Sequence, residues 1–275
     1  MKIIKYLTLF IIVGLSMSLD FRFENLPIQE SGRIKPIDSF ARNQLLRFYG
    51  KTSLKIEGES KRSSIEWLED IFIDTQGEIL QPIFNIRNPD VATSLGLERS
   101  NTHKYSFFDI INGFKENQEL IESLRNIDEN KQTLVETQII EIYRNVILFD
   151  EIAHSLYCFL PLIAVKDPII KEYMDVKDDQ VLSYSFFMRN IDKFKVLLQD
   201  LLNTKEDEWS NSHIELSQIA MHLQSLTQYH YAQTLKIIPP FDINENNSWS
   251  SPWELMDGRT LNDSQKLVLS YYEEL

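Results

Sequence analysis

The chain has 275 residues and a mass of 32.4 kDa, and its 43% hydrophobic and 11% aromatic content is typical of a folded globular protein. It carries 28 basic and 41 acidic side chains, and this net charge of -13 excludes non-specific nucleic-acid binding, which needs a basic surface. The single cysteine, Cys158, excludes an internal disulfide and the cysteine-pair zinc sites.

The N-terminus has the pattern of an export signal. Lys2 and Lys5 supply the positive region, an apolar stretch covers 6–15, and Ser16-Met17-Ser18 is a small-x-small cleavage site. The uncharged stretch 6–19 is shorter than the roughly 20 residues that span a bilayer. We expect residues 1–18 to be removed and residues 19–275 to form an extracytoplasmic, periplasmic domain. The alternative is membrane anchoring by residues 1–19.

Helix signals follow in the first third of the chain. Asp38 can act as the N-cap of a helix that runs to Tyr49, and Gly50 stands at its stop position. Ser63-Ser64-Ile65-Glu66 fits a capping box and predicts a second, shorter helix. The stretch 81–86, bounded by prolines, is the best strand candidate.

Three later stretches carry apolar residues at alternating steps of three and four, as amphipathic helices do. They cover 135–160, 187–201 and 216–230. The first is expected to end at Pro161, and the third follows a capping box from Ser212 to Glu215. Together they predict a mainly α fold, an irregular antiparallel helical bundle with few short strands and a looser subdivision near residue 130.

One short repeat is visible. Tyr-Ser-Phe-Phe occurs at Tyr105–Phe108 and again at Tyr184–Phe187, each time where a helix is expected to open. A tetrapeptide is weak support for duplication. We interpret it as coincidence.

Standard catalytic and cofactor motifs are absent from the sequence, including a P-loop, G-x-S-x-G, G-x-G-x-x-G and H-E-x-x-H. No catalytic residue and no metal site is assigned, and a binding role is favoured over an enzymatic one. A site assembled from distant residues would leave no such motif.

Three histidines are candidate haem or metal ligands. His222 and His230 would be about 12 Å apart along a helix, too far to share one ion. His230 lies on the apolar stripe, where a hydrogen-bonded core imidazole is the simpler interpretation and an axial haem ligand the alternative. His154 follows Asp150 and Glu151, which favours a helix-surface ion pair and, as an alternative, acid–base chemistry with Glu151.

A basic segment stands out within this acidic protein. Residues 33–62 carry eight basic and three acidic side chains. The simplest interpretation is a solvated helix face on which Asp38 pairs with Arg42. The alternative is a surface for anionic groups such as lipid head groups, haem propionates or an acidic partner, with Arg33, Lys35 and Arg42 as the contacts.

Aromatic residues cluster near the C-terminus, at Trp249, Trp253, Tyr271 and Tyr272. Amphipathic rings suit contact with a membrane surface or a partner, and they suit core anchoring equally.

Residues 26–42 read Leu26-Pro27-Ile28-Gln29-Glu30-Ser31-Gly32-Arg33-Ile34-Lys35-Pro36-Ile37-Asp38-Ser39-Phe40-Ala41-Arg42. This stretch resembles the opening of the extracytoplasmic part of cytochrome c biogenesis proteins of the CcsA/ResC and ResB type. Those proteins bring haem across the membrane and join it to apocytochrome thiols. This chain lacks the multiple membrane spans and the tryptophan-rich haem-handling segment of that family, so haem ligation is not carried over.

The resemblance implies an accessory, periplasmic portion of c-type cytochrome maturation. Such a component would position a haem-handling membrane partner or the apocytochrome, with haem as the cofactor concerned. The alternative is an exported binding module for a small acidic ligand or a partner protein.

Overall fold

The computed structural model describes residues 23–125, 127–241, 248–257 and 260–274. In this part of the chain there are thirteen α-helices, α2 to α14, and four antiparallel sheets of two short strands each. The prediction of a mainly α fold with few short strands is confirmed. The predicted export signal, residues 1–18, lies outside the described residues.

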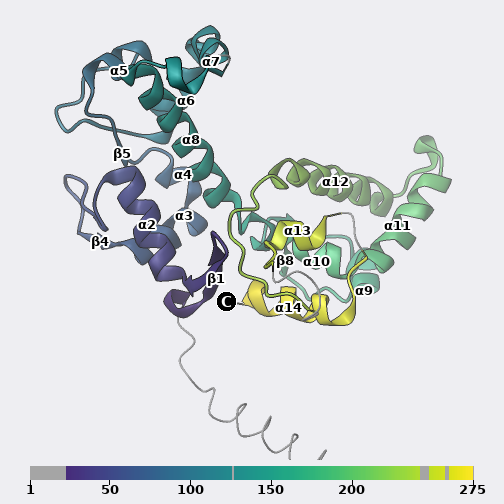
Figure 1. Ribbon diagram of the computed structural model, residues 1–275. Helices are drawn as coiled ribbons and strands as arrows, with labels where there is room; N and C mark the ends of the chain where they lie inside the picture. Colours follow the sequence, from purple (N-terminus) through teal and green to yellow (C-terminus); the bar gives the residue numbers. More distant parts are fainter. Residues whose placement is uncertain (1–22, 126, 242–247, 258–259, 275) are drawn as a thin grey trace, which may run out of the picture.

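Figure 1 shows two lobes joined by the long helix α8 (Leu134–His154). The first lobe contains η1 (Phe23–Asn25), β1 (Pro27–Glu30), β2 (Arg33–Pro36), α2 (Ile37–Tyr49), β3 (Ser53–Leu54), β4 (Arg62–Ser63), α3 (Ser64–Ile73), α4 (Thr75–Glu78), β5 (Phe84–Asn85), α5 (Pro89–Ser94), β6 (Lys104–Tyr105), α6 (Phe107–Glu116), α7 (Gln118–Arg125) and η2 (Glu129–Lys131).

The second lobe contains η3 (Tyr157–Phe159), β7 (Ile163–Ala164), α9 (Pro168–Met174), β8 (Val181–Leu182), α10 (Tyr184–Arg189), α11 (Ile191–Asn203), η4 (Glu206–Glu208), α12 (Asn211–Leu226), η5 (Thr227–Tyr229), α13 (Pro252–Met256) and α14 (Asp263–Glu274). Among the described residues, no helix combines the length and the apolar character that crossing a bilayer requires.

The ends of two helices in the first lobe follow the local signals. At the start of α3, the Ser63 hydroxyl accepts from the Glu66 N–H, and the Glu66 carboxylate accepts from the Ser63 N–H at 2.6 Å. Helix α2 ends at Gly50, whose φ of 81° lies in the left-handed region that glycine adopts without strain. Both predictions are confirmed.

The predicted N-cap of α2 is wrong. The helix begins at Ile37 behind Pro36, and no side chain caps it. The carboxylate of Asp38 pairs with Arg42 one turn later instead, which is the ion pair expected for this face.

The predicted capping box of α12 is wrong by two residues. Ser210 is the N-cap, and its partner at the third helical position is His213. Ser212 and Glu215 are engaged with α9 instead: the Ser212 hydroxyl donates to Asp167 at 2.8 Å, and the Glu215 carboxylate accepts from backbone N–H groups there.

Helix α8 ends at His154, before the predicted stop at Pro161. The N–H of Ser155 bonds to the carbonyl of Ile152, which tightens the last turn, and the chain continues as a 3-10 turn. Past the helix, Leu156 and Leu160 of the predicted stripe are half-buried, and Cys158 in the 3-10 turn is fully buried. The strand predicted at 81–86 is likewise shorter and consists of β5 alone.

The long helices do not all pack on one another. Helix α8 packs against α3, α5, α6 and α7, whereas α11 packs against α12 and α9. The bundle is therefore irregular, with one group of helices in each lobe.

Two stretches of the chain have the same architecture. In the first unit (residues 82–154), β5, α5, β6 and α6 follow one another, and β7, α9, β8 and α10 do so in the second unit (residues 161–226). Pro89 and Pro168 open α5 and α9, and Gly96 and Asp175 follow these helices with positive φ of 66° and 56°. Both pairs are 79 residues apart.

The repeat continues into the long helices. Thr133 caps α8 and Ser210 caps α12, 77 residues later. With that spacing, the buried positions of the two helices correspond: Ile139 with Leu216, Val146 with Leu223, and Phe149 with Leu226. Helix α8 covers α5 as α12 covers α9.

The repeated tetrapeptide Tyr-Ser-Phe-Phe is not part of this correspondence. Ser106 caps α6 and matches Ser183, which caps α10, whereas Ser185 lies inside α10. Tyr105 lies in a strand and Tyr184 in a helix. The two copies of the tetrapeptide are therefore out of register with the two structural units, although the units themselves are duplicated.

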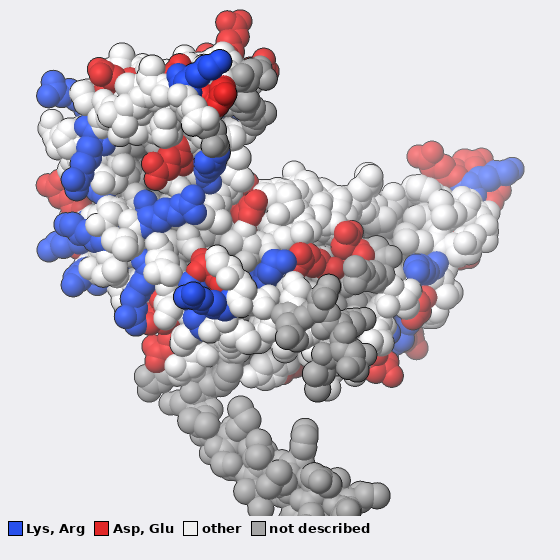
Figure 2. Space-filling view, in the orientation of Figure 1, with Lys and Arg blue, Asp and Glu red and all other residues white. Residues whose placement is uncertain are grey.

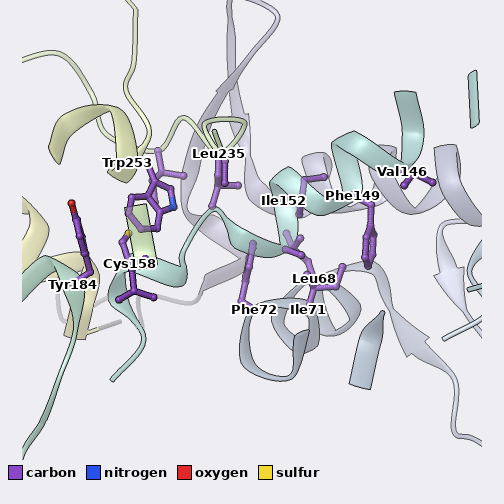
Figure 3. Close-up of a cluster of buried hydrophobic side chains, with 14 of the residues drawn as sticks. Leu68, Ile71, Phe72, Val146, Phe149, Ile152, Cys158, Tyr184, Leu235 and Trp253 are labelled. Atoms are coloured by element: carbon purple, nitrogen blue, oxygen red, sulfur yellow. The ribbon is translucent and has the colours of Figure 1, made fainter. Parts of the chain in front are cut away.

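A cluster of buried apolar side chains runs through both lobes. Figure 3 shows Phe149 and Ile152 of α8 near Leu68 and Ile71 of α3, with Trp253 and Cys158 farther along the same cluster. The indole of Trp253 is fully buried. Burial also raises the pKa of the Cys158 thiol, which keeps it protonated.

Candidate functional site

The motif that carries the family resemblance forms the β1–β2 hairpin and the start of α2. Ser31 and Gly32 make the turn, and both have positive φ, 51° and 75°, as a tight two-residue hairpin turn requires. Glu30 pairs with Arg33 across the hairpin. Arg33 is exposed and Ile34 is 61% exposed, and as successive residues of β2 they face opposite sides of the hairpin.

The hairpin is anchored to the C-terminal part of the chain. The N–H of Gln29 donates to the carbonyl of Lys236 at 2.9 Å, and the N–H of Trp249 donates to Oε1 of Gln29 at 2.9 Å. Leu26 and Ile28 are buried beneath it. The hairpin is therefore a fixed element of the fold.

The three predicted contact residues differ in how free they are. Lys35 pairs with Glu30 on the neighbouring strand, and Arg42 pairs with Asp38. Arg33 has no ion-pair partner among the described residues. Of these three residues, which are close together in the chain, only Arg33 has a guanidinium without an ion-pair partner among the described residues.

Arg62, at the end of the basic segment, has a structural role. Its guanidinium donates to Asp70 and Glu78 at 2.6 Å each, and Glu59 lies 3.4 Å away. Burial raises the pKa of Glu78, and the hydrogen bond and charge of Arg62 oppose that rise. Figure 2 shows that other Lys and Arg side chains gather on the visible face of the first lobe.

His154 lies at the end of α8 among three tyrosines. Its ring stacks on Tyr229 at 4.5 Å between centroids and contacts Tyr157 edge-on at 5.5 Å. Nδ1 lies 2.9 Å from the backbone carbonyl of Asp150, and because a carbonyl only accepts, Nδ1 carries the hydrogen. The hydroxyl of Tyr231 donates to the Asp150 carboxylate.

The predicted pairing of His154 with a preceding carboxylate forms with Asp150, whose Oδ1 lies 3.3 Å from Nδ1. Glu151, the partner in the acid–base alternative, accepts from the Thr234 hydroxyl instead. Burial and the bond to Asp150 both raise the pKa of Tyr231, so that hydroxyl keeps its proton. The group is a set of satisfied hydrogen bonds.

His230 lies against Trp253, with 5.0 Å between the ring centres. Its Nε2 is 3.3 Å from the Tyr184 hydroxyl, and its Nδ1 faces Oδ1 of Asp257 at 3.7 Å, beyond hydrogen-bond distance. The pKa of Tyr184 is raised to about 12, chiefly by burial, so this hydroxyl remains protonated.

Axial haem ligation uses a single imidazole nitrogen, so these contacts bear differently on the two histidines. Iron binding through Nε2 would require His230 to give up the Tyr184 hydroxyl, whereas the hydrogen bonds of the His154 ring use Nδ1. His222 is half-buried on α12. Within the described ranges, no group of three or more His, Cys, Asp or Glu side chains could hold a metal ion.

The sequence did not predict that Tyr229, Tyr231 and Trp253 are neighbours of the histidines. The C-terminal aromatic residues divide: Trp253 is core, Tyr272 donates its hydroxyl to the Ile237 carbonyl at 2.6 Å, and Tyr271 is 47% exposed. Only exposed rings of this set could reach a partner or membrane surface.

No protein-family model matches the chain, and no curated protein shows significant sequence similarity to it. A functional assignment therefore rests on the motif and on the geometry described above.

Proposed function

We propose that the protein is an extracytoplasmic component of c-type cytochrome maturation. It positions a haem-handling membrane partner or the apocytochrome and carries out no bond chemistry of its own. The observation that carries this proposal is the anchored hairpin, because the exposed residues of the stretch that resembles the maturation family lie on an element fixed to the rest of the fold.

Arg33 is the centre of this contact. Its guanidinium, which has no ion-pair partner among the described residues, can bind a partner carboxylate or a haem propionate with two parallel hydrogen bonds. Lys35 and Arg42 are already paired, so they contribute charge around the contact. Arg33 therefore contributes most to partner binding.

The test is a haem stain of c-type cytochromes in a strain deleted for this chain and complemented with variants. The triple variant Arg33→Ala, Lys35→Ala, Arg42→Ala is expected to restore much less stained cytochrome than the natural sequence. A matched control, Lys55→Ala, Lys61→Ala, Arg99→Ala, removes the same charge from exposed positions of the same lobe. It should restore normal levels.

Thermal unfolding of each purified variant shows whether it is folded. A folded triple variant with normal cytochromes would contradict the assigned contact. Unchanged cytochromes in the deletion strain itself would contradict the function and favour the alternative, an exported module that binds a small acidic ligand or a partner protein.

A further inference from the structure

The duplicated units differ at one junction, between the strand and the short helix that opens each unit. In the second unit, the Glu215 carboxylate of α12 accepts from the backbone N–H groups of Lys166 and Asp167, the latter at 2.9 Å. The unit thus binds a carboxylate that belongs to the chain itself. This carboxylate fixes α12 on the junction between β7 and α9.

The first unit has no carboxylate at that position. With the spacing of 79 residues found for the short helices, Arg87 and Asn88 correspond to Lys166 and Asp167. With the spacing of 77 residues found for the long helices, Gln138 of α8 corresponds to Glu215. Gln138 accepts from the Asn88 side chain at 2.7 Å. Among the described residues, the backbone N–H groups of Arg87 and Asn88 have no hydrogen-bond partner.

A cleft of about 220 Å³ lies at this junction. Its lining is polar, and it includes the side chains of two arginines, four amides and one acid: Arg47, Arg87, Asn85, Asn88, Gln138, Asn145 and Glu141. The Nε of Arg47 donates to Asn145, and Arg87 forms no ion pair within the described part of the chain. The cleft therefore holds two guanidinium groups without a carboxylate partner.

Further cations lie at its edge. Lys104 pairs with Asn85 in the β5–β6 ladder, and its ammonium lies 4.0 Å above the ring centre of Tyr49. Burial, with Arg87 and Lys51 as positive neighbours, lowers the pKa of Lys104 to about 8. A protein with a net charge of -13 thus concentrates positive potential at one cleft.

We propose that this cleft binds the carboxylate of a small organic anion, beside Gln138, at the N–H groups that correspond to those bound by Glu215 in the second unit. The backbone N–H groups of Arg87 and Asn88 would donate to its oxygens, and the guanidinium groups of Arg87 and Arg47 would neutralise it. The surrounding amides are positioned for the remaining polar groups of the ligand. The proposal does not depend on the cytochrome function.

Isothermal titration of the purified chain at low ionic strength tests this inference, with citrate, succinate and inorganic phosphate as probes. Saturable binding of citrate or succinate at one site per chain is expected. Arg87→Gln should weaken it about tenfold, the loss of one charge-assisted contact. Arg99→Gln, an exposed arginine of the same lobe, should leave it unchanged.

Another variant gives the first unit the carboxylate that the second unit has. Gln138→Glu introduces the carboxylate that corresponds to Glu215, so this variant should fill its own site, lose citrate binding and unfold at a higher temperature. Nuclear magnetic resonance of Lys104 gives another readout. Its pKa should rise in saturating citrate and in Gln138→Glu, because added negative charge stabilises the ammonium.

Four results would overturn the inference. They are the absence of saturable binding with all three probes, equal weakening by Arg99→Gln, unchanged citrate binding in Gln138→Glu, and tighter binding of phosphate than of both carboxylates.

Discussion

The indole N–H of Trp253 donates a 2.9 Å hydrogen bond to the backbone carbonyl of His154. His154 is the last residue of α8, where carbonyl groups lack partners within the helix. Trp253 lies 99 residues later in α13 and is fully buried. A residue of the C-terminal region thus completes the end of the helix that joins the two lobes.

Trp253→Phe should lower the free energy of unfolding by about 2 kcal/mol, because the variant leaves the His154 carbonyl without its donor and a void beside it. Urea unfolding followed by circular dichroism measures the loss. Trp249→Phe is the control, since Trp249 is half-buried and its bond to Gln29 uses the backbone N–H, which remains. Equal losses in both variants would contradict the role of the indole N–H.

Arg62→Ala should destabilise the fold by about 3 kcal/mol at neutral pH, because Glu78 is left as a buried carboxylate without its partner. Arg42→Ala removes an exposed pair with Asp38 and should cost much less.

The loss in Arg62→Ala should shrink as the pH falls. Burial already raises the folded-state pKa of Glu78, and removing Arg62 raises it further. A raised carboxyl pKa favours the folded state below the unfolded pKa and disfavours it as the pH rises through the folded value. Urea unfolding from about pH 7 to about pH 4.5 tests this, and a loss that grows toward acid would contradict it.

Lys104 should give the folding stability a measurable pH dependence. Its folded pKa of about 8 lies below the ordinary value of 10.5, so between these values the unfolded chain binds more protons. The contribution of Lys104 to stability therefore rises with pH in this window and is lost as the pH falls through the folded value. Lys104→Met should flatten the rise between about pH 8 and about pH 10.5. An unchanged slope would contradict the assignment.

The left-handed residues after α5 and α9 give a reciprocal pair of variants. Gly96→Ala should cost about 1 kcal/mol, because φ is 66° and no neighbouring atom lies closer than 3.8 Å to an added Cβ. Asp175→Gly, at the matching position with φ of 56°, should stabilise the protein by about 0.5 kcal/mol. Thermal unfolding measures both, and a stabilising Gly96→Ala or a destabilising Asp175→Gly would contradict the correspondence.

Local signals predicted the fold class because apolar spacing and capping residues act within a few turns. The capping box at Ser63 and the stop at Gly50 depend only on neighbours in the chain. The end of α8 at His154 was missed because a distant donor, Trp253, stabilises it. The duplication was missed because the two units conserve capping roles and burial more than residue identity.

The site was predicted in part. The sequence indicated that the basic segment differs from the rest of the chain. The structure shows that its cations differ in their partners: Arg62 is half-buried among carboxylates, whereas Arg33 has no ion-pair partner among the described residues. Arg87 and Lys104 join Arg47 only through the fold. Their proximity has no signature in the linear sequence, because β5, β6 and α2 are brought together by packing.

The attachment of the hairpin to Lys236 and Trp249 has a consequence for biogenesis. Trp249 lies 220 residues after Gln29, so most of the chain must be synthesised and delivered before the hairpin acquires its final support. Contacts of such long sequence separation form late in folding. The surface around Arg33 thus reaches its final form only after the C-terminal region has packed against it, so an incomplete chain would not present the contact proposed above.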